Sequence, residues 1–259
     1  MSVSLAVLPN RLDFLAYGEW LTSYFPHDPL PGFGPLLTPG GRAVTRSAES
    51  ARASMWISST GGSAPLSAGS DLVARRGAMS VDFHQRWTRE MPDCTLVEDS
   101  SARFAPGPAG GYTIDLRVAL RVSAAFAIPP GRNGLVNILL APQLLASAGG
   151  QVRNSAGQYG PEHMNGRLAR WCAAVGVVDG ETVGITVIDH PANPWHPCPW
   201  TVRNDGLLAL APFNWQSITL AAGQQTVFRC RVLVHRGYVD NGWADARIAD
   251  LSREPAPRI

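Results

Sequence analysis

Two histidines, an aspartate and an asparagine stand close together in a segment that contains four prolines. The segment, residues 189–203, reads Asp-His-Pro-Ala-Asn-Pro-Trp-His-Pro-Cys-Pro-Trp-Thr-Val-Arg. Histidine suits proton transfer because its ordinary pKa lies near neutral pH. Each proline fixes φ and removes a backbone donor, so neither a helix nor a central strand can continue here. A stiff, polar loop of this kind predicts a site that binds a ligand or transfers protons.

A simpler interpretation of the same segment is that the prolines only shape a turn. His190 and Asn193 would then form hydrogen bonds with the backbone of that turn, as such side chains often do in loops. The sequence alone leaves both interpretations open.

Candidate site residues fall into two groups. The candidate catalytic residues are the histidines that could transfer a proton: His190, His196, His235 and His84. The candidate substrate-binding residues offer polar groups or aromatic faces to an oxygen-rich molecule: Arg86, Asn193, Arg203, Trp56, Trp195 and Trp200. No cofactor motif, nucleophile elbow or phosphate loop is visible, so the expected reaction is an isomerisation, epimerisation, elimination or cyclisation that needs no cofactor.

These residues must be positioned by strands. Residues 183–189 have the alternation of a half-buried strand that ends near His190. Residues 79–87 also alternate, which places Asp82, His84 and Arg86 on one face of a strand. That face could belong to the site, or it could be a solvated surface with an ion pair of little energetic value.

The longest alternating run covers residues 112–128. A run of this length exceeds a usual strand, so we expect a bulge or bend near residues 123–125. Residues 225–237 alternate as well and place Arg229, Arg231 and His235 on the face opposite the apolar one. Residues 12–24 fit a hairpin or a short helix, and the apolar residues of 243–252 have helical spacing.

Composition supports one large β domain. The chain has 259 residues, of which 45% are hydrophobic and 16% charged, enough for a sizeable core. Apolar alternation interrupted at short intervals by glycine and proline predicts an all-β, single-domain sandwich over residues 1–259 with a short C-terminal helix. A loop rich in Gly, Ser and Ala at residues 61–70 could form a lid.

Several functions are disfavoured by the composition. The 22 basic residues, all arginine, nearly balance 20 acidic ones, which argues against nucleic-acid binding by bulk charge. The absence of lysine excludes Schiff-base chemistry. Four widely spaced cysteines form neither a disulfide framework nor a zinc motif. With no membrane-length apolar run and no signal peptide, we expect a cytoplasmic protein with a small-molecule ligand and without a metal or cofactor; a homodimer stays open.

Three segments together resemble a known bacterial family. They are Pro-Leu-Leu-Thr-Pro-Gly-Gly-Arg-Ala-Val-Thr-Arg (35–46), Asn-Gly-Arg-Leu-Ala-Arg-Trp-Cys (165–172), and residues 189–203 followed by Leu-Ala-Ala-Gly-Gln and Phe-Arg-Cys-Arg-Val-Leu-Val-His-Arg-Gly within 220–237. The chain is similar to the family labelled PmoA, or methane oxygenase. The resemblance implies a supersandwich like that of galactose mutarotases, a shape that often handles sugars on a concave sheet. A membrane-bound oxygenase subunit is not expected, because no segment is long and apolar enough to span a bilayer.

The chain departs from that family in one segment. Where members carry a His-rich Asp-His-Pro-His-His segment, this sequence has Glu-Ser-Ala-Arg-Ala-Ser-Met-Trp at residues 49–56. A metal site needs about three converging ligands, so metal catalysis is not expected here. The main hypothesis is therefore an enzyme that uses histidine for acid–base chemistry on a sugar-like, polyoxygenated substrate. The alternatives are a non-catalytic protein that binds the same ligand class and a purely structural role.

Overall fold

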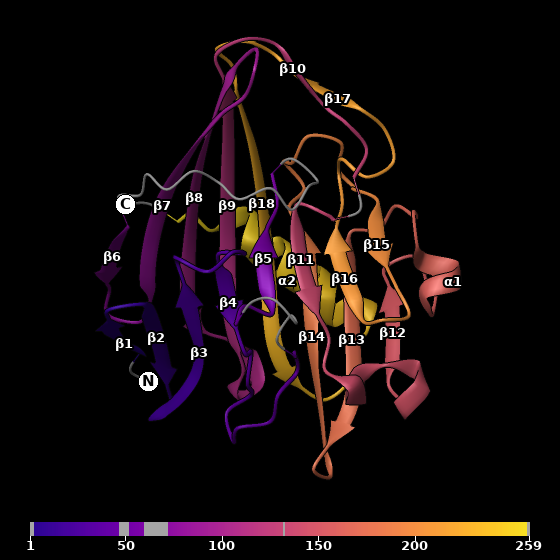
Figure 1. Ribbon diagram of the computed structural model, residues 1–259. Coiled ribbons are helices and arrows are strands. Elements are labelled where there is room, and N and C mark those ends of the chain that lie inside the picture. The colour runs from indigo at the N-terminus through magenta and orange to yellow at the C-terminus, as the bar shows by residue number, and fades with distance from the viewer. Residues whose placement is uncertain (1–2, 47–51, 60–71, 132, 258–259) are drawn as a thin grey trace.

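The protein is built from two eight-stranded antiparallel sheets that pack face to face (Figure 1). The structure is a computed structural model and describes residues 3–46, 52–59, 72–131 and 133–257. The expected all-β sandwich with a short C-terminal helix is confirmed. Residues 49–51 of the segment that departs from the resembled family, and the loop at 61–70 considered as a lid, lie outside the described residues.

The first sheet has the strand order β1-β2-β3-β4-β5-β11-β16-β15. Its strands are β1 (Val3–Leu8), β2 (Arg11–Ala16), β3 (Glu19–Phe25), β4 (Gly32–Gly34), β5 (Met55–Ile57), β11 (Val136–Leu139), β16 (Leu207–Leu210) and β15 (Trp200–Val202). Residues 11–25 form a hairpin rather than a helix, because Tyr17 (φ 58°) and Gly18 (φ 81°) make a two-residue turn with positive φ at both positions.

The second sheet has the order β12-β13-β14-β18-β9-β8-β7-β6. Its strands are β12 (Gln151–Asn154), β13 (Trp171–Val178), β14 (Glu181–Asp189), β18 (Gln225–Arg236), β9 (Tyr112–Val122), β8 (Thr95–Pro106), β7 (Val81–Glu90) and β6 (Val73–Arg76). The remaining elements are the ribbon of β10 (Phe126–Ile128) and β17 (Ile218–Leu220), three short 3-10 helices (Pro108–Gly110, Pro142–Leu144 and Ala146–Ala148), and the helices α1 (Pro161–Met164) and α2 (Asn241–Arg253).

The long alternating run of residues 112–128 is interrupted near residues 123–125, as expected from its length. Strand β9 ends at Val122, and after three residues the chain resumes as β10, which pairs with β17 outside the two large sheets. In Figure 1 this ribbon lies above the upper end of the sandwich.

The inner faces of the two sheets form one continuous apolar core. An aromatic cluster joins the sheets: Phe14 and Tyr24 of the first sheet lie 5.9 and 4.6 Å, centroid to centroid, from Phe83 of the second. Tilted and edge-to-face arrangements of this kind are favourable for aromatic rings. The core thus fixes how the two sheets face each other.

Helix α2 covers part of the outer face of the second sheet (Figure 1). The side chain of Asp240 caps its first turn by accepting a hydrogen bond from the backbone nitrogen of Trp243 (2.7 Å). The apolar side of the helix packs on a second hydrophobic cluster that includes Trp171, Ile188 and Leu233. These three side chains are therefore buried although they point away from the main core.

Candidate functional site

The proline-rich loop after β14 is organised around one buried carboxylate. Asp189, which is fully buried, accepts hydrogen bonds from the backbone nitrogen of Cys198 (2.9 Å) and from Asn193 Nδ2 (2.7 Å). Its Oδ2 lies 2.8 Å from Nδ1 of His196. Burial raises the pKa of Asp189, and these hydrogen bonds and the neighbouring imidazole oppose that rise.

Asn193 attaches the loop to the neighbouring strand. Its amide oxygen accepts from the backbone nitrogen of Arg229 (2.7 Å), and its Nδ2 donates to the carbonyl of Arg229 (2.6 Å) as well as to Asp189. Both the amide oxygen and the amide nitrogen of Asn193 are therefore bonded to other groups of the protein. Asn193, expected as a ligand-binding group, therefore occupies the turn-stabilising role that the sequence left open.

His190 has the same kind of local role. Its Nδ1 accepts from the backbone nitrogen of Ala192 (3.0 Å), and only 4% of the residue is exposed. Burial, followed by the positive charges of Arg229 and His196, lowers the pKa of His190 to about 4. This histidine is thus held neutral inside the turn.

His196 and Trp195 form the accessible part of the loop. The side chain of His196 is 17% exposed. Its Nε2 has no hydrogen-bond partner in the described part of the chain and is not buried, so it reaches solvent. Trp195 is 45% exposed, stacks on Phe228 at 6.0 Å, and has a φ of 60°. A bulky residue in this left-handed region is uncommon, and such strain is concentrated at functional sites.

His235 does not share this site, although the sequence grouped it with His190 and His196 as a candidate catalytic residue. It pairs with Gly184, whereas His190 follows Asp189 at the other end of β14. Six residues of strand separate the two positions, about 20 Å at roughly 3.3 Å per residue. His235 is 2% exposed, lies against Trp243, and hydrogen-bonds to Thr186 (2.9 Å), so a substrate at His196 cannot reach it.

His84 and Arg86 lie on the outer face of β7, as the alternation predicted. Both contact Asp99, through His84 Nε2 at 3.2 Å and Arg86 Nε at 2.7 Å. Three strands of the sheet, β8, β9 and β18, separate β7 from β14. At about 4.8 Å per strand this pair is too distant to act on a small molecule held by His196.

The three remaining candidates are also dispersed. Trp200 is fully buried in the core, and its Nε1 donates to the carbonyl of Ala169 (2.8 Å). Trp56 packs with Leu207 and Ala209 in a separate cluster on the first sheet. Arg203 pairs with Asp205 beside an open surface cleft of about 570 Å³. Trp200 begins β15 and Arg203 directly follows that strand, so the part of the proline-rich segment between β14 and β15 holds none of the three.

A polar cluster that the sequence analysis missed lies between the sheets. Glu98 on β8 is 2% exposed and is directly opposite Trp87 on β7. Its Oε1 accepts from Ser100 Oγ (2.6 Å), while Gln85 accepts from the hydroxyl of Tyr24 across the sandwich. Burial raises the pKa of Glu98, and Ser100, Ser59 and the charge of Arg89 only partly oppose that rise. The sequence held one signal: Gln85 stands on the apolar side of the alternation in residues 79–87.

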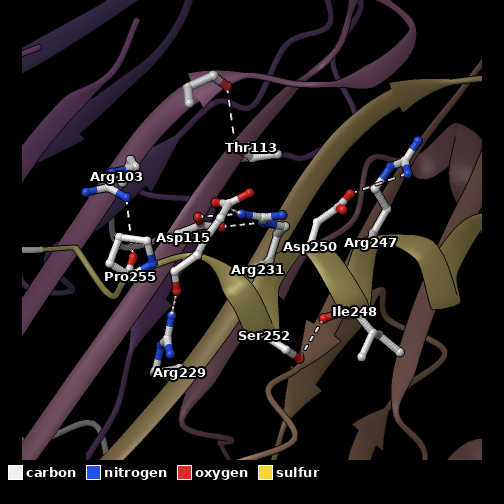
Figure 2. A network of polar contacts seen from close by, with 12 residues as sticks. Arg103, Thr113, Asp115, Arg229, Arg231, Arg247, Ile248, Asp250, Ser252 and Pro255 are labelled. Atoms are coloured by element: carbon white, nitrogen blue, oxygen red, sulfur yellow. Dashed lines mark hydrogen bonds and ion pairs between the residues drawn. The ribbon is translucent and has the colours of Figure 1, made fainter.

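The outer face of the second sheet carries a network of charged residues (Figure 2). Arg231 forms two hydrogen bonds with Asp115, at 2.6 and 2.7 Å, and a third contact with Glu254 from the C-terminal tail. Arg229 and Arg103 donate to the carbonyls of Glu254 (3.0 Å) and Pro255 (3.3 Å), so the tail is bound across this face. Every charge in this network has a partner, which indicates a structural role.

The described residues contain neither a metal-binding cluster nor a membrane-length helix. No group of three or more His, Cys, Asp or Glu side chains there has the arrangement of a metal site. Within the same residues, no helix is long and apolar enough to cross a bilayer.

The fold and the loop define a β-sandwich protein with an Asp–His pair at one end of the sheet. The chain belongs to a family of unknown function, DUF6807, whose model matches residues 53–249. This match does not carry the PmoA label, so the relation to that family stays a prediction. No functionally curated protein matches the sequence.

Solved structures with similar arrangements include three proteins. A putative kojibiose phosphorylase from the human microbiome has 6% identity and a TM-score of 0.39 over 68% of this chain and 21% of its own. A galactose mutarotase-like protein from Lactobacillus casei has 11% identity and a TM-score of 0.38 over 90% of this chain and 100% of its own. A polysaccharide lyase has 14% identity and a TM-score of 0.25, covering 92% and 33%. The chain thus spans about a fifth of the phosphorylase and a third of the lyase.

Proposed function

We propose that the protein is an enzyme that moves a proton on a small, polyoxygenated, sugar-like molecule, with His196 as the acid–base group and Asp189 as its positioning residue. The observation that carries this proposal is the contact of 2.8 Å between His196 Nδ1 and Asp189 Oδ2, with Nε2 open to solvent. A carboxylate on one imidazole nitrogen fixes the ring and its tautomer, which leaves the other nitrogen to exchange a proton with a ligand.

The loop supports this role in two further ways. Asp189 is itself immobilised by Asn193 and by the Cys198 backbone nitrogen, so the ring of His196 is anchored to the sheet rather than to a mobile loop. The exposed indole of Trp195 is next in sequence and could stack on the apolar face of a sugar ring. Isomerisation, epimerisation or elimination on a carbohydrate requires only groups of these kinds.

Proton exchange in deuterated water tests the proposal. The protein is incubated with a panel of aldoses, ketoses and uronic acids, and incorporation of deuterium at carbon is followed by proton NMR. We expect turnover of at least one compound, a loss of about a hundredfold in His196→Ala because general acid–base groups contribute at least that much, and no change in His163→Ala. His163 is a suitable control because its side chain is 70% exposed.

A protein that binds such molecules without catalysis is the second candidate, since Trp195 alone could supply stacking. Saturation-transfer NMR with the same panel separates the two. Binding that depends on Trp195 but produces no deuterium exchange would replace the enzyme by the binding protein. Exchange that persists unchanged in His196→Ala would remove His196 from the mechanism.

A further inference from the structure

An open cleft lies where the free edges of the two sheets approach each other. Strand β15 ends the first sheet, β12 ends the second, and helix α1 contacts both strands (Figure 1). Two cavities occur here, an outer one of about 570 Å³ and an inner one of about 180 Å³. Both are lined by Pro161, Val202, Arg203 and Asn204, so the inner cavity adjoins the outer one and is reached through it.

The inner cavity is mainly apolar. Its walls include Leu140, Leu145, Val152 and Val202, which come from both sheets and the segments beside them. An apolar cavity of about 150 Å³ in a protein stays dry and binds benzene. The inner cavity, at about 180 Å³, therefore has room for a compact apolar group the size of a benzene ring.

The outer cavity is lined mainly by polar side chains, among them Asn165 and Asn204. Asn165 Oδ1 accepts a hydrogen bond from the backbone nitrogen of Val202 (3.1 Å). The Nδ2 of Asn165 and the whole side-chain amide of Asn204 make no hydrogen bond with the described residues. A side-chain amide offers two donors and an acceptor, so these groups can bind the hydroxyls of a ligand.

The charges around the outer cavity balance each other. Arg203 pairs with Asp205, and Arg46 donates to the backbone carbonyl of Asp205 (2.7 Å). Glu162 also lines the cavity, so two positive and two negative side chains lie at or beside it. Without an excess of either sign, the cleft has no electrostatic preference for an ionic ligand.

We propose that this cleft binds an uncharged amphiphilic small molecule. Its compact apolar group occupies the inner cavity, and a head group with several hydroxyls contacts Asn165 and Asn204; an aryl glycoside is the simplest molecule of this kind. Arg203, which the sequence grouped with the ligand-binding residues, belongs to this site and not to the Asp189–His196 pair. The proposal goes beyond the role of His196 and does not require it.

Binding of two glucosides to the full chain, measured by calorimetry, tests the proposal. Phenyl β-D-glucopyranoside should bind to the wild type. Methyl β-D-glucopyranoside has the same head group without the ring, so it leaves the inner cavity empty and should bind at least about tenfold more weakly. Asn204→Ala should lower the affinity for the phenyl glucoside by about threefold to tenfold, as expected for the loss of one hydrogen bond.

Two tryptophan substitutions form a matched pair. Ala146 lines the inner cavity from the short 3-10 helix Ala146–Ala148 and is exposed, so Ala146→Trp obstructs the cavity without a change in the core. We expect it to lower the affinity for the phenyl glucoside at least about tenfold. Ala148 is exposed on the same helix but lines neither cavity, so Ala148→Trp should bind like the wild type.

Four results would overturn the proposal. They are no binding of the phenyl glucoside, equal binding of the two glucosides, equal affinity of Ala146→Trp and Ala148→Trp, and a wild-type dimer that Ala146→Trp dissociates in sedimentation. The last result would make the cleft an interface between copies of the chain. Trp195→Ala and His196→Ala should bind the phenyl glucoside like the wild type. Loss of affinity in these two variants instead would place the ligand at the proline-rich loop, so the cleft would fail while the proposed function stands.

Discussion

Arg231 on β18 lies directly opposite Asp115 on β9, and the two side chains are joined by hydrogen bonds of 2.6 and 2.7 Å in a nearly closed environment (Figure 2). Their side chains are only 5% and 6% exposed. Removing Asp115 would leave the buried charge of Arg231 with Glu254 as its remaining acidic partner, and weakening a buried pair in this way costs more than the net value of the pair.

Asp115→Asn should therefore lower the free energy of unfolding by about 3–5 kcal/mol, measured by urea denaturation. Asp205→Asn is the control, because the pair of Asp205 with Arg203 is about half exposed and its loss should cost less than about 1 kcal/mol. Equal effects of the two substitutions would contradict this assignment.

Glu98→Gln should stabilise the protein relative to the wild type once the pH is above the folded-state pKa of Glu98. Burial raises the pKa of Glu98 in the folded state, so folding favours the protonated form. Relative to the variant, the wild type is most stable at low pH and loses stability as pH rises through the folded pKa. We expect a difference of about 1–3 kcal/mol, as for other buried polar groups without partners. Denaturation over a range of pH measures it, and parallel curves for wild type and variant would refute the prediction.

Acid should destabilise the protein partly through His235. Burial lowers the pKa of His235 from 6.5 to about 4, so the unfolded chain binds a proton that the folded chain does not. Stability from this group is complete above pH 6.5 and is lost as pH falls toward about 4, by about 3 kcal/mol. His235→Gln, whose side chain can still contact Thr186, should make the free energy of unfolding fall less steeply as the pH is lowered. His163→Gln should not change this pH dependence. The prediction is contradicted if the free energy of unfolding of His235→Gln depends on pH as steeply as that of the wild type.

Asn193→Ala should release the proline-rich loop from β18. Three hydrogen bonds are lost, to Asp189 and to both backbone groups of Arg229, at an expected cost of about 1–3 kcal/mol. Amide hydrogen exchange should accelerate at Cys198, whose backbone nitrogen donates to Asp189. Unchanged protection at Cys198 would show that the prolines alone hold the loop.

Much of the secondary structure was predictable because it depends on local periodicity. The alternation in residues 79–87 and 112–128 predicted strands and their faces, and the length of the second run predicted its interruption after Val122. The helical spacing near the C-terminus predicted α2. The choice between hairpin and helix at residues 12–24 was not predictable, because the positive φ of Tyr17 is unusual for that residue type.

The candidate site was predictable only in part. Asp189, His196 and Trp195 are close together because they are close in sequence, in a loop that prolines keep short and stiff. His235 stands in the strand that pairs with β14, yet the antiparallel register places it at the opposite end from His190. The alternation within a strand shows which face of the sheet a residue occupies. It does not show which residue of the neighbouring strand lies opposite.

By itself the sequence determined the all-β class, the strand faces and the proline-rich corner. The alternation of strand residues and the backbone restriction by proline are both local effects that involve only a few neighbouring residues. Only the tertiary structure decided which polar groups become neighbours. Ser100 lies opposite Gln85 because β7 and β8 pair in one register, and the first sheet then covers Gln85 with Tyr24. Such contacts depend on register and on the packing of two sheets, which no local pattern encodes.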